Sequence, residues 1–509
     1  MTTTLTLFGV ILVIGAMAYR RASLFTATLA TAAALVEAIG ADYAGRHLPL
    51  PVVTATVFAT WFGAEAIFGV SATFVKEGLH GVVADPFGAS LCLIIAGIFF
   101  SRKLYKLNVL TLGDYFRLRY NRTVEILTTL CIVIAYLGWV SAQIKALGLL
   151  FNVVTDGAIS QTAGMILGAA IVLTYTTLGG MLSVAILDFV QMGVIMGGML
   201  FIAWLISGQT GGVMPVIAHA SAAGKLDFFP EPDPWKWIAF IGAGLTMMLG
   251  SIPQQDVFQR ITSARTAKIA LWGSILGGSI YFCFTFVPMF IAYSATLINP
   301  EQYNALMASD SQLVLPTLVL EQTPVFAQAI FFGAALAAIM SCSSATLLAP
   351  SVAFAENILR GLLPPMGDHE FLRLMRITIV CFTAAVLAFA LNSNASIFKM
   401  VENAYKVTLA GAFVPLFFGA FWKRATTQGA LAAIFGGVGS WVLIEVLVGE
   451  ASPVPPQLIG LGLSMLGMIA GSLLPQWVGH RLPGEDVHEA LHHRAAAETH
   501  HVGEHPHHH

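Results

Sequence analysis

The sequence predicts an all-α protein that crosses a membrane many times, and three observations support this fold class. Roughly a dozen apolar stretches of about 20 residues run through the chain, and a helix of that length matches the hydrocarbon thickness of a bilayer. Charged residues make up only 10% of the chain, whereas soluble domains carry about 25%. Lys and Arg fill every second gap between the apolar stretches, as they do when cytoplasmic loops retain their cations.

The apolar stretches predict about thirteen membrane-spanning helices in the plasma (inner) membrane. The loop cations, densest over residues 101–122, place the N-terminus outside and the C-terminus in the cytoplasm. The predicted spans are 5–20, 52–76, 85–107, 123–151, 161–178, 182–207, 236–252, 268–297, 324–348, 372–391, 396–421, 427–448 and 456–477.

Two further segments allow more than one interpretation. Residues 22–40 are apolar enough to cross the membrane, but a crossing there would invert everything that follows, so an interfacial or buried helix is favoured. The tail over residues 480–509 is rich in histidine, which could bind metal ions. Because its histidines lack the spacing of a tetrahedral site, we favour a disordered cytoplasmic tail.

Glycines interrupt two of the predicted spans. Gly63 and Gly69 lie within span 52–76, and span 236–252 contains three glycines and is followed by Pro253. Broken helices in corresponding halves of a membrane protein predict an inverted-repeat transporter with its binding site near the bilayer midplane. The alternative is that these small residues only allow neighbouring helices to pack closely.

Hydroxyl side chains gather on the span 324–348, in the string IMSCSSATLL. Ser341 and Ser344 are three residues apart and therefore share one face of a helix. Their oxygens suit a hard cation such as Na⁺, and carbonyls of a broken helix could complete the site. Alternatively, these hydroxyls donate hydrogen bonds to carbonyls of their own helix.

Ionisable residues inside membrane spans are costly and usually functional. Glu65 and Lys145 could pair with each other, or could hold the two charges of a zwitterionic substrate. Asp188 lies near the start of its span, where it could gate the exit of an ion or cap its helix.

Four strings resemble the sodium:solute symporter family, with the choline and proline carriers as its nearest branches. The resemblance covers about residues 52–450 and implies a LeuT-type core of two inverted five-helix repeats with flanking helices. The strings are LTLGDYFRLRYN (110–121), TYTTLGGMLSVAILDFVQ (174–191), IPQQDVFQR (252–260) and AAIMSCSSATLLAPSVAFAENI (337–358).

The resemblance also implies a division of the chain around its two repeats. The parts are an N-terminal helix and interfacial segment (1–50), the first repeat (51–207), an extracellular loop (208–235), the second repeat (236–422), two further membrane helices (423–479) and the histidine-rich tail (480–509).

For the coupling ion, the resemblance implies a Na⁺ site and gives Asp188 a role in Na⁺ release. The family usually shows Ser or Thr where this chain has Cys342, and a thiol is a poor ligand for Na⁺. Weak Na⁺ binding, substitution by Ser344 and coupling to a proton therefore all stay open. The implied Na⁺ site comprises carbonyls around Thr60 and Gly63, the carbonyl of Ala338, and the side chains of Ser341, Cys342 and Ser344.

For the solute, the resemblance places Trp61 and Trp139 in the binding pocket. An aromatic cage suits a quaternary ammonium ligand, but Gln254 stands where choline carriers show a tryptophan. This departure favours a smaller polar solute, such as an amino acid, over choline. The predicted solute-binding residues are Trp61, Glu65, Trp139, Gln143, Lys145 and Gln254.

These observations together predict symport of a small solute with Na⁺, or with H⁺, across a lipid bilayer by alternating access. A sensor with a transporter fold is the second class, but such proteins usually carry a long signalling domain. The spans show no metal-ligand cluster, nucleophile motif or phosphate loop, so we do not expect an enzyme, and we expect no nucleic-acid partner. The oligomeric state and the identity of the solute are left open.

Overall fold

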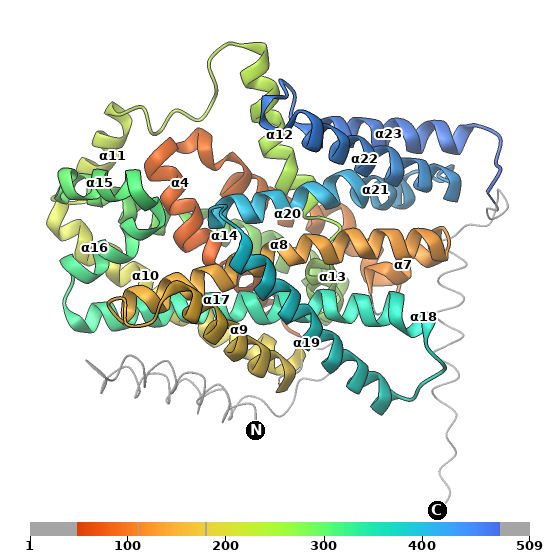
Figure 1. Ribbon diagram of the computed structural model, residues 1–509, viewed down its shortest axis with the longest axis horizontal. Coiled ribbons are helices and arrows are strands. Elements are labelled where there is room, and N and C mark those ends of the chain that lie inside the picture. The colour runs from red at the N-terminus through yellow and green to blue at the C-terminus, as the bar shows by residue number, and fades with distance from the viewer. Residues whose placement is uncertain (1–47, 110, 179–180, 479–509) are drawn as a thin grey trace, which may run out of the picture.

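The computed structural model describes residues 48–109, 111–178 and 181–478, and this part of the chain is built from helices (Figure 1). The predictions for residues 5–20, 22–40 and 480–509 lie outside the described residues. A single bridge joins Leu48 to Ala264, and the described residues form no strand.

The helices carry the labels of Figure 1, and η marks a 3-10 or π-helical turn. The first set is α3 (Leu50–Trp61), η1 (Glu65–Gly69), α4 (Val70–Glu77), η2 (Leu79–Val82), η3 (Val83–Gly88), α5 (Ala89–Ile95), η4 (Ala96–Phe100), α6 (Ser101–Lys106), α7 (Leu112–Arg119), α8 (Arg122–Val154), α9 (Gln161–Leu178), α10 (Met181–Thr210) and α11 (Val213–Ala222). The second set is α12 (Pro234–Gly250), α13 (Gln255–Ser263), α14 (Ala267–Ile298), α15 (Pro300–Asp310), η5 (Ser311–Leu313), α16 (Val314–Gln322), α17 (Val325–Phe354), η6 (Ala355–Leu359), α18 (Arg360–Leu362), α19 (Asp368–Asn392), α20 (Ile397–Gly411), α21 (Phe413–Phe421), α22 (Thr427–Leu447), η7 (Gly449–Ala451) and α23 (Pro456–Leu473).

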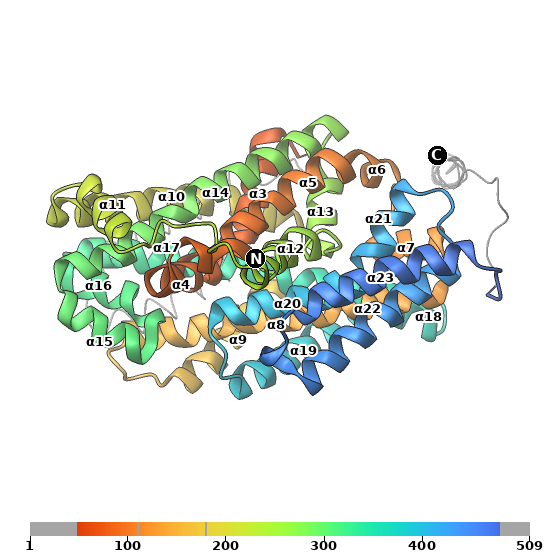
Figure 2. The same ribbon diagram turned by 90° about the horizontal axis from the view of Figure 1, so that it is seen from above.

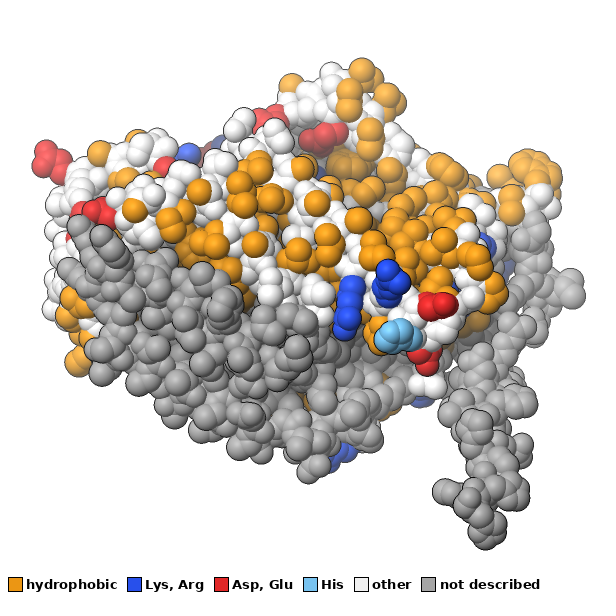
Figure 3. Space-filling view, turned by 60° about the horizontal axis from the view of Figure 1, so that its bottom comes forward, with side chains coloured by type: hydrophobic (Ala, Val, Ile, Leu, Met, Phe, Trp, Pro, Cys, Tyr) orange, Lys and Arg blue, Asp and Glu red, His pale blue; other side chains and the backbone are white. Residues whose placement is uncertain are grey.

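Length and apolar composition identify eight membrane-spanning helices among the described residues, or up to eleven if each of three bent pairs is one span. The many-span prediction is confirmed, but the count of thirteen is not. The outward faces of these helices carry exposed apolar side chains, such as Val446 and Leu447 on α22, which suit contact with lipid. Figure 3 shows apolar side chains spread over one face, with one group of charged side chains toward its lower right and others near its top and left edge.

The first bent pair joins α3 to η1 and α4 at an angle of 56°. The break spans Phe62 to Ala64, within the span predicted to be broken. A Cβ added to Gly63 would lie 2.7 Å from the Cys342 sulfur and 2.8 Å from the Gln143 Oε1 atom. Glycine is therefore required here, because the backbone at the break touches side chains of α8 and α17.

The second bent pair joins α12 to α13 at 48°, and here the sequence interpretation needs a correction. Helix α12 runs without interruption through two glycines and ends at Gly250, so the break lies after it, over residues 251–254. Added Cβ atoms would lie 2.7 Å from Pro455 at Gly242 and 2.6 Å from the Tyr405 carbonyl at Gly250. These glycines thus serve close packing, while the break includes Pro253, which has no N–H to donate.

Helices from distant parts of the chain meet around these breaks. Helix α3 packs on α10, α14 and α17, and the long helix α8 packs on α9, α17, α19 and α20. Helices α22 and α23 lie side by side at one edge of the molecule in both ribbon views (Figures 1 and 2). The broken helix α3–η1 is therefore enclosed by other helices.

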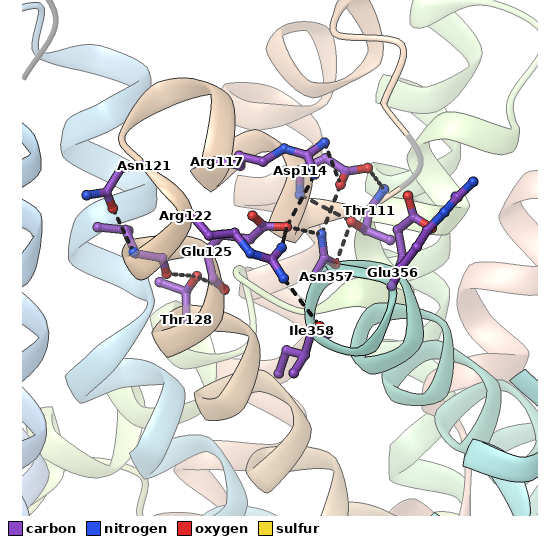
Figure 4. Close-up of polar contacts among 12 residues, drawn as sticks. Thr111, Asp114, Arg117, Asn121, Arg122, Glu125, Thr128, Glu356, Asn357 and Ile358 are labelled. Atoms are coloured by element: carbon purple, nitrogen blue, oxygen red, sulfur yellow. Dashed lines mark hydrogen bonds and ion pairs between the residues drawn. The ribbon is translucent and has the colours of Figure 1, made fainter. Parts of the chain in front are cut away.

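A polar network centred on Asn357 ties the ends of α7, α8 and η6 together (Figure 4). The Asn357 Nδ2 atom donates to Asp114 Oδ1 at 2.9 Å and to Glu125 Oε1 at 3.0 Å, while Thr111 donates to Asn357 Oδ1 at 2.7 Å. Arg122 completes this Asn357 network by pairing with Glu125 at 2.9 Å. Both acids of the network are thus held partly by arginines, since Arg117 also lies 3.4 Å from Asp114.

Candidate functional site

Oxygen atoms from three helices meet beside the break in α3. Asp188 on α10 accepts a hydrogen bond from Thr56 of α3 at 2.7 Å and another from Ser341 of α17 at 2.5 Å. The Ser341 Oγ atom also lies 3.4 Å from the carbonyl oxygen of Ala59. We call Thr56, Ala59, Asp188 and Ser341 the oxygen cluster, and all four are buried. One carboxylate with hydroxyl and carbonyl oxygens is the donor set that hard cations prefer.

The oxygen cluster shares with the predicted Na⁺ site only Ser341 and a carbonyl next to Thr60, and it adds Thr56 and Asp188. The carbonyl facing Ser341 is that of Ala59, one residue before Thr60, whose hydroxyl instead donates to the Thr56 carbonyl at 2.6 Å. The Ser344 hydroxyl donates to the Ser341 carbonyl at 3.1 Å, within its own helix, in agreement with the alternative interpretation. Sequence reasoning missed Thr56, although its spacing of three from Ala59 places both on one face of α3.

Asp188 does not cap its own helix, because α10 begins seven residues earlier at Met181. Both of its oxygens accept from hydroxyls on other helices. The interpretation of Asp188 as a cap is therefore wrong, and its carboxylate instead lies beside Ser341 of α17. The buried Arg260 lies near the oxygen cluster, because its Nε donates to the hydroxyl of Thr60, the residue after Ala59, at 3.1 Å.

A second group of side chains lies on the other side of the break, around Glu65. The Glu65 carboxylate accepts from the Trp139 indole at 3.1 Å and from the Gln143 amide at 2.6 Å. Gln143 Oε1 in turn accepts from the backbone N–H of Ala64 at 2.9 Å, which satisfies a donor freed by the break. Glu65 is thus fixed by neutral donors, and its side chain is buried.

Aromatic rings from the three helices α3, α8 and α20 surround these groups. Trp139 lies 5.8 Å from Trp61, 5.7 Å from Tyr136 and 5.7 Å from Tyr405, measured between ring centroids. The Trp61 indole donates to Asp256 Oδ2 at 2.9 Å, and the Tyr136 hydroxyl contacts the other oxygen of the same carboxylate. These residues, together with Glu65, form what we call the aromatic–acid cluster.

Three members of the aromatic–acid cluster were not among the solute-binding residues predicted from the sequence, although Asp256 stands out there as an ionisable residue near the end of a span. On α8, Tyr136 precedes Trp139 by three residues, and Gln143 follows Trp139 by four. Helical spacing from the two predicted residues could therefore have revealed Tyr136. Tyr405 comes from α20 and Asp256 from the start of α13, at sequence separations that periodicity does not reach.

Two predicted solute-binding residues, Lys145 and Gln254, donate to groups outside the aromatic–acid cluster. Lys145 donates to the carbonyls of Ala395 at 2.5 Å and Ser393 at 3.4 Å, in the connection between α19 and α20. It follows Gln143 by two residues and therefore points away from the face that holds Glu65, so its predicted pairing or shared pocket with Glu65 is wrong. Gln254 lies in the second break and donates to the Thr408 hydroxyl at 3.2 Å.

Of the remaining predicted residues, Cys342 lies between the two clusters. Cys342 follows Ser341 on α17, and its sulfur lies against Gly63, which also touches Gln143. Ala338 lies on the same helix, one turn before Ser341, and is buried. The break at Gly63 therefore separates an oxygen cluster suited to a small hard cation from an aromatic–acid cluster suited to a larger, softer one.

Comparison with known proteins gives consistent results across sequence and structure. The human high affinity choline transporter 1 is 27% identical over 77% of this chain and 69% of its own length, and the sodium/proline symporter of Haemophilus influenzae is 26% identical over 72% and 75%. The chain spans 63% of the length of the Drosophila melanogaster choline transporter, at 27% identity. These relatives are transporters and not enzymes.

A solved structure of a Na⁺-coupled sialic acid symporter, in a substrate-bound outward-open state, matches 94% of this chain and 98% of its own with a TM-score of 0.73 at 18% identity. This likeness confirms the predicted all-helical, LeuT-type fold class. The family model described as the sodium:solute symporter family matches residues 43–437, well over half of the sequence. The chain belongs to the sodium:solute symporter family.

Proposed function

We propose that this protein is a secondary active transporter that couples Na⁺ entry to the uptake of a small organic cation. One observation carries the proposal: Glu65 and Asp256 are buried carboxylates held by indole and phenol groups within a cluster of aromatic rings. An ammonium group in this cluster would meet carboxylate oxygens and aromatic faces together, and both attract positive charge.

The partners of Glu65 support a positively charged solute. A carboxylate buried in a membrane protein is costly unless positive charge or several donors compensate it. Its two hydrogen-bond donors, Trp139 and Gln143, are neutral. A cationic solute would supply the compensating charge when it binds.

The sequence favours an amino acid over choline, because Gln254 replaces a tryptophan of the choline carriers. Two observations support an organic cation instead. Lys145, which would hold the carboxylate of an amino acid, donates to carbonyls elsewhere. Tyr405 contributes an aromatic ring that the sequence interpretation did not include. Several relatives are named as choline transporters, which agrees with this choice.

For the coupling ion we propose Na⁺ at the oxygen cluster. Asp188 would supply a negative charge, and Thr56, Ser341 and the Ala59 carbonyl would supply neutral oxygens. A proton is the alternative, and the gradients described below separate the two ions.

In the proposed architecture, residues 51–207 and 236–422 form the two inverted repeats, and residues 423–479 add two flanking helices. The alternation of loop charges supports an orientation with the N-terminus outside the plasma membrane and the C-terminus in the cytoplasm. The Asn357 network then lies at the cytoplasmic ends of its helices.

Uptake into proteoliposomes tests the proposed solute class. The panel contains choline as a cation, glycine betaine as its zwitterionic counterpart, and proline as an amino acid. We expect uptake of the cation in an inward Na⁺ gradient and much weaker uptake of the zwitterions. Selective uptake of proline or betaine would replace the organic cation with an amino-acid-like solute. The Trp139→Ala variant should lose affinity for the cation, provided that it elutes as a folded monodisperse protein.

The coupling ion is tested in the same vesicles with separate Na⁺ and proton gradients. We expect Na⁺ to raise solute affinity, because coupling between two bound ligands typically contributes about 1–3 kcal/mol. The Ser341→Ala variant should require more Na⁺ for half-maximal uptake. If Ser341→Ala kept the wild-type Na⁺ dependence, the oxygen cluster would not be the Na⁺ site.

A further inference from the structure

Asp85 is a buried carboxylate that belongs to neither cluster. It lies in the apolar span from Leu79 to Lys106, and its side chain is 1% exposed. Its Oδ1 atom accepts from the Tyr281 hydroxyl of α14 at 2.6 Å. Its Oδ2 atom is buried and has no hydrogen-bond partner among the described residues. Ionisable groups at this depth are rare and usually take part in function.

The backbone at Asp85 departs from helical geometry, with φ −144° and ψ 121° inside the η3 turn. Non-helical backbone at membrane depth occurs where it is enclosed by protein or lines a cavity. Helix α12 encloses it here, since a Cβ added to Gly88 would lie 2.9 Å from the Gly244 carbonyl. Asp85 is therefore held at an irregular point between η3, α12 and α14.

The surroundings of Asp85 repeat the chemistry of the aromatic–acid cluster. Tyr281 lies 6.2 Å from Phe62, and Phe62 lies 5.4 Å from Phe284, measured between ring centroids. We call Asp85, Tyr281, Phe62 and Phe284 the Asp85 centre. Like the first cluster, it combines a buried carboxylate, a phenol donor and further aromatic rings.

Two consecutive residues at the break in α3 join these groups. Trp61 donates to Asp256 and contacts the rings of Trp139 and Tyr405, whereas Phe62 contacts Tyr281, the donor to Asp85. The two acid-bearing aromatic groups thus adjoin at one short stretch of backbone, through the consecutive side chains of Trp61 and Phe62.

We propose that the Asp85 centre binds a second positively charged group, so that the preferred solutes carry two ammonium groups. One group would be held by Glu65 and Asp256, and the other by the free Oδ2 of Asp85 beside Tyr281 and Phe62. This inference rests on the proposed transport of an organic cation and specifies the solute further. A single quaternary ammonium would leave the Asp85 carboxylate uncompensated, whereas a diammonium solute would compensate both acidic groups.

Competition against labelled choline uptake tests this inference with linear α,ω-diamines and monoamines of equal carbon number. In the wild-type protein, a diamine of suitable length should compete better than its matched monoamine. The Asp85→Asn variant, which keeps the side-chain shape, should lower the diamine-to-monoamine preference about tenfold or more. Asp85→Glu keeps the charge and should retain a preference for diamines, with a shorter optimal chain. Asp227→Asn, the same change on an exposed residue, serves as the control.

The outcomes separate this inference from the proposed function. If neither choline nor any amine is bound, the proposed organic-cation transport itself fails. If amines are bound but wild-type protein shows no diamine preference, or if Asp85→Asn weakens diamines and monoamines equally, the second ammonium site is wrong. Should Asp85→Asn not fold, the chain-length optimum of Asp85→Glu still decides the question.

Discussion

Glu65 and Glu125 are both buried glutamates, yet their partners differ in kind. Glu65, beside the break in α3, accepts hydrogen bonds from the neutral side chains of Trp139 and Gln143. Glu125, in the Asn357 network, accepts from Asn357 and pairs with Arg122 at 2.9 Å (Figure 4). Burial is similar, at 3% and 0% exposure, so burial alone does not separate their roles.

The charge of the partner does separate them. The arginine beside Glu125 belongs to the protein, so the ion pair is complete in the chain itself and can hold α7, α8 and η6 together. The neutral donors beside Glu65 orient its carboxylate without cancelling its charge. A carboxylate held only by neutral donors, as Glu65 is, is available to a cationic ligand. A carboxylate paired with an arginine, as Glu125 is, stabilises the fold.

The largest effect is expected from Glu65→Gln. This change removes the charge that would meet an ammonium group and keeps the side-chain size. Solute affinity should fall about 100-fold, because loss of one partner of a buried charge pair costs about 2–5 kcal/mol. The melting temperature should change little, since loss of a buried, uncompensated charge offsets the one hydrogen bond that the amide nitrogen cannot accept. Binding titrations and thermal unfolding of the purified protein measure both, and an unchanged affinity would contradict the assigned role of Glu65.

For Glu125→Gln we expect the opposite result, a loss of stability with solute affinity retained. Arg122 would lose its carboxylate partner, and we expect a loss of stability of about 2 kcal/mol, because Arg122 is itself 37% exposed and remains partly solvated. Solute affinity of the folded fraction should stay close to that of the wild type. Thermal unfolding of Glu125→Gln, Arg122→Met and the double variant provides a double-mutant cycle. Additive losses would mean that the pair does not act as a unit.

A smaller effect is expected from Trp139→Phe, which keeps an aromatic ring but removes the indole donor to Glu65. Solute affinity should fall about tenfold, since a hydrogen bond to a charged group contributes about 1.5 kcal/mol or more. Trp204→Phe is the matched control, because Trp204 is 68% exposed on α10. Equal effects of both changes on affinity would argue against a specific role of the Trp139 indole.

The smallest effect is expected from Cys342→Ser, which replaces a sulfur between the two clusters with an oxygen. The Na⁺ concentration for half-maximal uptake should fall about threefold, because a hydroxyl is the better ligand for a hard cation and a weak additional ligand contributes below about 1 kcal/mol. Cys131→Ser, at a buried cysteine packed against Gly411, is the control. A rise in the required Na⁺ would instead show that the added hydroxyl disturbs the packing against Gly63.

The sequence was sufficient to place Trp61, Glu65, Trp139 and Gln143 near one another, and the structure brings these four side chains together. That prediction drew on the family resemblance for Trp61 and Trp139 and on the cost of an ionisable residue within a span for Glu65. The prediction that Lys145 shares this pocket was wrong. Lys145 follows Gln143 by two residues, so its side chain leaves α8 on a different face. Asp85 was not singled out at all, although it lies inside an apolar span and ionisable residues there are costly.

The broken helices show the same division between local and long-range information. Glycines mark α3 and α12 alike in the sequence, but only α3 breaks at its glycine. At Gly63 the backbone meets Cys342 and Gln143, whereas Gly242 and Gly250 accommodate Pro455 and the Tyr405 carbonyl within an intact helix. The same residue type therefore has two consequences that depend on the neighbouring helix.

The sequence by itself determined the fold class, the approximate positions of most spans and the family. The fold class and the spans follow from the hydrophobicity of about 20 consecutive residues and from loop charge, which are local quantities set by the thickness and low polarity of the bilayer. The family followed instead from the resemblance of four strings in the sequence. Only the tertiary structure decided which carboxylate meets an arginine, a hydroxyl or an indole. The donors to Asp188, Asp256 and Asp85 come from helices more than 100 residues away in the chain, and packing alone determines which of them come within hydrogen-bond distance.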